Sequence, residues 1–214
     1  MSPGAGCFRH RAGRCGPQEL RPHGIIAGMP SPLGHMLGGA IAGGVVSGRR
    51  LPLGMLAVFA AAGAAPDLDL VFGSHSGPTH GLGSALIAGG AAWVLWSTLL
   101  RRHGGVRIAT AVAAAYASHA LLDWLSTDTS PPIGIMALWP LSTEHYLSPY
   151  SVFLPLLRRY SGPEFWLINL RAVIRELLIL GPLFLIVWWP RGERRPAGLR
   201  LSDDRGAVRE PPAR

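Results

Sequence analysis

Five apolar segments, separated by short polar stretches, run through most of the chain. Two of them, at residues 33–47 and 51–65, would form helices of roughly 22 Å, which is short for a bilayer core of about 30 Å. The segments at 82–100 and 108–125 are long enough to span it, and the last one begins near 164 and ends at Trp189. The pattern predicts an all-α, polytopic membrane helical bundle.

Composition supports a membrane protein over a soluble one. Hydrophobic residues make up 49% of the chain and charged residues 15%, below the roughly 25% that is typical of soluble domains. Many of the 28 glycines lie inside the apolar segments, where small residues let membrane helices approach closely. The net charge is +8, but no basic face interleaved with aromatic residues is visible. We therefore expect membrane lipid as a partner, and no nucleic acid.

Clusters of arginine indicate how the predicted helices cross the membrane. They lie at residues 49–50, 101–107 and 191–195, and cytoplasmic loops of membrane proteins carry an excess of basic residues. Five spans place all three clusters on the cytoplasmic side and the loops at 66–81 and 126–165 on the other. We expect an integral membrane protein whose active face points outward.

The two ends of the chain differ from its apolar body. Residues 1–28 form an Arg/Gly/Pro-rich tail without the apolar core of a signal peptide. The predicted topology places this arginine-rich tail on the outer side, which contradicts the excess of basic residues expected in cytoplasmic segments. A translation start at Met29 would remove this conflict. Residues 191–214 are polar and rich in arginine, which is typical of disorder. The membrane-embedded domain is thus predicted at residues 29–190.

Histidine and aspartate side chains gather near the predicted outer face. His119 and Asp123 are four residues apart and share one face of a helix, while either of Asp67 and Asp69 could bind a metal, with the other bridging or orienting, and one of them could accept a proton during catalysis. Ionisable groups at membrane depth usually mark function. The candidate metal ligands are Asp67, Asp69, His80, His119 and Asp123, followed by His35 and His75.

Imidazole and carboxylate ligands without a thiolate suit zinc, manganese or iron better than copper(I). We expect a divalent metal ion, zinc first and manganese or iron as alternatives. Each residue alone also has a structural explanation: His35 and Asp67 could begin helices, and His119 with Asp123 could form a hydrogen-bonded pair. Their co-location in the predicted topology favours the metal site.

Four stretches together resemble the YdjM-like family of inner-membrane metal-dependent hydrolases, which is also described as LexA-binding. The stretches are Gly34-His35, PDLD at 66–69, HSGPTH at 75–80 and SHALLD at 118–123, followed by LWP at 138–140. Ser76 and Gly81 stand where the family usually has Arg and Ser. The resemblance implies hydrolase activity, a regulatory protein partner and a location in the bacterial inner (cytoplasmic) membrane. The order of the ligands is more distantly similar to all-α zinc phospholipases C and nucleases, which cleave phosphoesters.

The leading hypothesis is a membrane-bound metal-dependent hydrolase in which metal-activated water attacks an ester, such as a lipid phosphoester. A non-catalytic metal-binding membrane protein is the alternative, whether transporter, sensor or scaffold for a regulatory partner. Transport needs polar groups along a path across the bilayer, and the inner halves of the predicted spans are nearly free of them.

Overall fold

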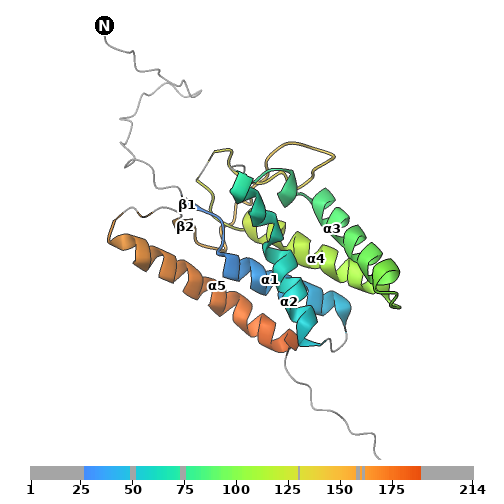
Figure 1. Ribbon diagram of the computed structural model, residues 1–214. Coiled ribbons are helices and arrows are strands. Elements are labelled where there is room, and N and C mark those ends of the chain that lie inside the picture. The colour runs from blue at the N-terminus through green and yellow to red at the C-terminus, as the bar shows by residue number, and fades with distance from the viewer. Residues whose placement is uncertain are drawn as a thin grey trace, which may run out of the picture.

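The computed structural model describes residues 27–48, 52–72, 76–129, 131–157, 160 and 162–188. The described chain is predominantly helical, as predicted (Figure 1). Its long helices are α1 (Pro32–Ser47), α2 (Leu53–Ala64), α3 (Leu82–Val94), α4 (Gly105–Trp124) and α5 (Glu164–Trp188).

Shorter elements connect these helices. The 3-10 helices η1 (Ala65–Phe72) and η2 (Pro78–His80) lie between α2 and α3, and a π-helical turn, η3 (Leu95–Leu99), extends α3. The strands β1 (Ala27–Gly28) and β2 (Leu156–Leu157) pair antiparallel. The predicted tails lie outside the described residues apart from Ala27 and Gly28, which pair with Leu157 and Leu156.

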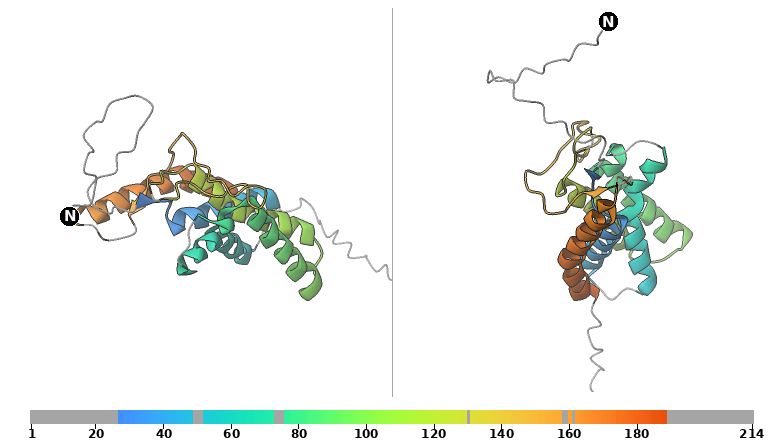
Figure 2. Two further views of the ribbon diagram at one scale, coloured as in Figure 1. Left: turned by 90° about the horizontal axis from the view of Figure 1, so that it is seen from above. Right: turned by 90° about the vertical axis from the view of Figure 1, so that its left-hand side faces the viewer.

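Helices α1 and α4 form the centre of the bundle. Helix α1 packs against α2, α4 and α5, and α4 packs against α1, α2 and α3. Figure 2 shows α5 beside α1 at one side of the bundle, with α3 at the other. The approach of α1 to α2 depends on glycine, because a Cβ at Gly63 would lie only 2.8 Å from the Cα of Gly39. Small residues thus set the helix spacing, as expected for a membrane bundle.

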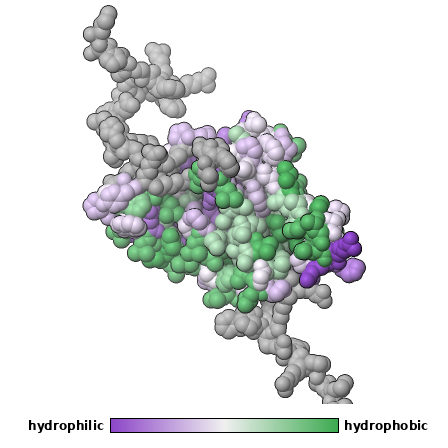
Figure 3. Space-filling view, in the orientation of Figure 1, coloured by the Kyte–Doolittle hydropathy of each residue, from purple (hydrophilic) through white to green (hydrophobic). Residues whose placement is uncertain are grey.

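Three candidate membrane spans, rather than the expected five, are found among the described residues. They are Leu53–Leu70, Leu82–Leu99 and Gly105–Trp124. Helix α1 is too short because Gly48, in the left-handed conformation, ends it after 16 residues. Helix α5 has 25 residues, but it carries Arg171, Arg175 and Glu176. Apolar side chains nevertheless cover much of the helical surface, and polar residues gather at its two ends (Figure 3).

The segment between α4 and α5 covers one end of the bundle. Backbone hydrogen bonds tie it to the start of α3, where Leu82 N–H donates to Ala137 O (2.9 Å), and to the end of α4, where Ser148 N–H donates to Trp124 O (2.9 Å). The buried Ile135 of this segment packs with Met29. The starts of α1 and α3 and the ends of α2 and α4 therefore share one end of the molecule with this loop.

Candidate metal centre

Five of the predicted site residues converge at this covered end of the bundle. They come from four elements, with Asp123 in the middle of the group. Four of the five side chains are fully buried, and only the Asp67 carboxylate reaches the surface, with 17% of its side chain exposed. The group comprises His35 of α1, Asp67 of η1, His80 of η2, and His119 and Asp123 of α4.

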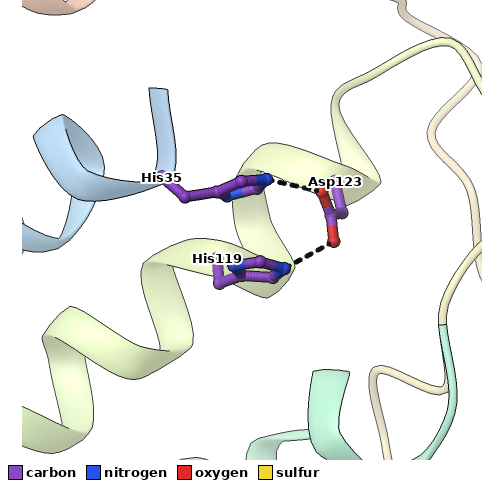
Figure 4. A group of neighbouring side chains, drawn as sticks. All are labelled: His35, His119 and Asp123. Atoms are coloured by element: carbon purple, nitrogen blue, oxygen red, sulfur yellow. Dashed lines mark ion pairs between the residues drawn. The ribbon is translucent and has the colours of Figure 1, made fainter. Parts of the chain in front are cut away.

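The two oxygens of Asp123 face different imidazoles. Oδ1 lies 3.2 Å from Nε2 of His35, and Oδ2 lies 3.1 Å from Nε2 of His119 (Figure 4). His119 and Asp123 share a face because they are one turn apart on α4. The rings of His35 and His119 stack with centroids 3.7 Å apart, so both Nε2 atoms point to the same carboxylate. His35, His119 and Asp123 form a first group whose ligand atoms lie within 4.8 Å of one another.

Asp67, His80 and His119 form a second such group. Oδ1 of Asp67 lies 3.7 Å from Nε2 of His119, and Nε2 of His80 lies 3.5 Å from Oδ2 of Asp123. The second group therefore shares His119 with the first and touches its carboxylate. These residues could hold one metal ion or two.

Neighbouring groups fix which ring nitrogens face the cluster. Nδ1 of His119 lies 2.8 Å from the carbonyl oxygen of Gly63, which can only accept a hydrogen bond, so Nδ1 is the donor and Nε2 faces the cluster. Nδ1 of His80 lies 3.4 Å from Oδ2 of Asp69 and 3.0 Å from Oγ1 of Thr79. A carbonyl or carboxylate behind the ring is the usual arrangement for a metal-binding histidine.

Asp69 therefore occupies a different position from Asp67. Its Oδ2 also accepts a hydrogen bond from Oγ1 of Thr79 (2.7 Å), and its carboxylate sits behind His80, outside both candidate groups. Of the two roles predicted for the aspartate pair, the structure gives Asp67 the position of a ligand. Asp69 has the position of a group that orients His80.

The buried polar atoms of the cluster fit a cation. Both ring nitrogens of His35, Nε2 of His119 and both oxygens of Asp123 are buried without a hydrogen-bond partner. A buried polar atom without such a partner costs about 1–3 kcal/mol, and here Nε2 of His35 and Nε2 of His119 face the two oxygens of Asp123. Imidazole nitrogen and carboxylate oxygen are the ligand types that zinc, manganese and iron accept. These two groups of side chains could therefore hold a metal ion.

The remaining predicted ligand, His75, lies outside the described residues. Neither Thr79 nor the Gly63 carbonyl was predicted from the sequence, and of the two only Thr79 has a sequence signal, because it lies in the HSGPTH stretch. Glu176, a buried carboxylate in α5, was not predicted either, although an ionisable residue in an apolar helix is itself a signal of function.

Comparison with known proteins supports a single family. The family model described as YdjM inner membrane protein matches residues 29–197, a range that includes every residue of the candidate metal centre. No curated protein and no solved structure matches the chain significantly.

Proposed function

Since the chain belongs to the YdjM inner membrane protein family, we propose that it is a membrane-bound metal-dependent hydrolase. The convergence of five ionisable side chains, among them the buried carboxylate of Asp123, carries this proposal. We propose zinc as the metal, with manganese or iron as alternatives. The ligands proposed are His35, Asp67, His80, His119 and Asp123, with Asp69 orienting His80.

A bound divalent cation would polarise an ester and make water acidic enough to ionise near neutral pH. The protein's own groups would supply the rest. Asp123 balances the charge and aligns the imidazoles that face it. Asp67 is the member of the cluster that reaches the surface, so its side is where substrate and water would enter. We propose Asp67 as the base that would accept the proton of the attacking water.

A lipid phosphoester is the substrate class we propose. Asp67 lies near the end of the apolar span Leu53–Leu70, and two exposed leucines follow it in the chain. Leu68 is 65% exposed and Leu70 is 44% exposed. A substrate that reaches Asp67 along this surface would meet acyl-chain-like side chains beside a polar centre, which suits an amphipathic ester.

The outward orientation of the site is also a proposal. Arg101 and Arg102 are exposed between η3 and α4, at the helix ends away from the candidate metal centre. The positive-inside rule places them in the cytoplasm, which puts the centre at the outer face. The arginine clusters at 49–50 and 191–195 lie outside the described residues.

A non-catalytic metal-binding protein, acting as a sensor or as a scaffold for a regulatory partner, is the second candidate. Burial of four of the five cluster residues favours it, because a structural cation needs no open side. Transport fits poorly. The core next to the cluster is apolar, with Phe59, Ala111 and Ala115 fully buried, and it offers a cation no ligands along that part of the bundle.

Metal content by mass spectrometry tests the proposal first. Detergent-purified wild type should hold stoichiometric zinc, manganese or iron, and His119→Ala/Asp123→Ala should hold none. His103→Ala is the matched control, since His103 is exposed in the loop before α4. Hydrolysis of phospholipid or model phosphoesters by the wild type, lost in the double variant, would support an enzyme. Bound metal without hydrolysis of any ester would favour the second candidate, and absence of metal after reconstitution would overturn the site.

A further inference from the structure

A second buried carboxylate lies outside the candidate metal centre. Glu176, in the middle of α5, is 1% exposed, although most of this helix is apolar. Its Oε1 accepts a hydrogen bond from the backbone N–H of Ser31 (2.7 Å), and its Oε2 accepts one from the Ser31 hydroxyl. Both carboxylate oxygens thus accept hydrogen bonds from a single residue that lies 145 positions earlier in the chain.

Ser31 is the residue at which α1 begins. Its hydroxyl accepts a hydrogen bond from Gly34 N–H (3.0 Å), and its carbonyl accepts one from His35 N–H (3.1 Å). The backbone of His35 is therefore anchored directly to Ser31. A negative carboxylate beside the first turn also interacts favourably with the positive end of the helix dipole.

Gly34 permits this approach. A Cβ at position 34 would lie 2.7 Å from Oε2 and 2.9 Å from Cδ of Glu176, which is too close for any side chain without movement of the carboxylate. The Gly34-His35 pair thus combines two roles. The glycine admits Glu176 to the helix start, and the next residue supplies an imidazole to Asp123.

We propose that Glu176 is a positioning residue for His35. Helix α5 holds the start of α1 through Ser31, and this fixes the depth and rotation at which Nε2 of His35 meets Oδ1 of Asp123. The inference rests on the proposed metal centre, of which His35 is a ligand. It gives α5 a role in metal binding, although α5 contributes no residue to the candidate groups.

A double-mutant cycle on the full-length chain in detergent tests this role. Zinc affinity is measured by competition with a chelating dye for wild type, Glu176→Gln, His35→Ala and the double variant. Glu176→Gln keeps the size of the side chain but removes its charge and one acceptor. Groups that orient a ligand typically change metal affinity about 10–100-fold, and we expect roughly 10-fold for Glu176→Gln because it acts through Ser31.

The His35→Ala background separates positioning from general stability. If Glu176 acts through His35, Glu176→Gln should weaken zinc binding by less than about twofold once His35 is absent, by the logic of coupled mutations. Glu164→Gln is the matched control, since Glu164 is exposed in the first turn of the same helix, and it should leave zinc affinity unchanged. Ser31→Ala removes the hydroxyl link from the other side and should show the same dependence on His35. It replaces Glu176→Gln in the cycle if that variant does not fold.

The outcomes are distinct. Unchanged zinc affinity in Glu176→Gln, or an equal loss in the presence and absence of His35, would overturn the positioning role while the metal centre stands. A wild type that binds no zinc, manganese or iron would overturn the proposed function, and this inference with it.

Discussion

Substitution of Asp123 by asparagine separates a metal centre from a metal-free ion-pair cluster. The change keeps the shape of the side chain but leaves one acceptor oxygen where two face His35 and His119 at 3.2 and 3.1 Å. In a metal centre the carboxylate is a ligand, so Asp123→Asn should abolish metal binding. In a metal-free cluster the carboxylate would instead stabilise charged imidazoles.

The two cases predict different stabilities. A cation present at 1,000 times its dissociation constant stabilises the fold by about 4.1 kcal/mol, which corresponds to a rise in Tm of roughly 8–16 °C for a chain of about this size. Removal of one partner from a buried ion pair also costs about 3–5 kcal/mol. A loss of stability in Asp123→Asn alone therefore does not distinguish the two cases. They are distinguished by whether this loss of stability depends on the presence of metal.

Thermal unfolding in detergent, with added zinc and with a chelator, is the decisive assay. For a metal centre, chelation should lower the Tm of the wild type to near that of Asp123→Asn, and zinc should leave the variant unchanged. His103→Ala should respond to zinc and chelator as the wild type does. A wild-type Tm that is the same with zinc and with chelator, together with a large loss in Asp123→Asn, would refute the metal centre in favour of a structural cluster.

Three further predictions follow from the same contacts. Asp69→Asn should weaken metal binding about 10–100-fold without abolishing it, because Asp69 orients His80 and is not a ligand; complete loss in the dye competition assay would make it a ligand. Gly63→Ala should lower stability by about 1–3 kcal/mol in thermal unfolding, because its Cβ would lie 2.8 Å from the Cα of Gly39; an unchanged Tm would contradict the close approach of α1 and α2. In a chain without its native cysteines, Leu141→Cys, at a position that is 92% exposed, should react with a membrane-impermeant maleimide in intact cells, and Arg101→Cys should not; the reverse result would place the site inside.

The helices could be predicted closely because residues that are typical of helix ends stand at their boundaries. Ser31 followed by Pro32 is a typical helix start, and α1 begins at Pro32. Gly48 ends the same helix in the left-handed conformation, which glycine adopts without strain. The five expected apolar segments correspond to the helices α1 to α5, but not all of these helices have the length and composition of a membrane span. The charges within α5 and the short length of α1 reduce the count to three among the described residues.

The candidate site was predicted as a set of residues, but its internal order was not. Topology alone brings residues at the outer helix ends together, so His35, His80 and Asp123 could be grouped before any coordinates. The sequence PDLD cannot tell which aspartate turns toward His119 and which toward His80, because that depends on the path of η1. Likewise, the contact of Glu176 with Ser31 joins segments 145 residues apart, which no local pattern records.

Helix packing and the chemistry of the site are coupled through Gly63. Its lack of a side chain lets α2 approach Gly39 of α1, and its carbonyl, close to the end of α2, accepts the hydrogen bond from Nδ1 of His119. A carbonyl in this position selects the tautomer in which Nε2 faces the cluster. The same glycine therefore sets both the separation of two helices and the orientation of an imidazole on a third. This is why we expect substitutions at Gly63 to alter metal affinity as well as stability.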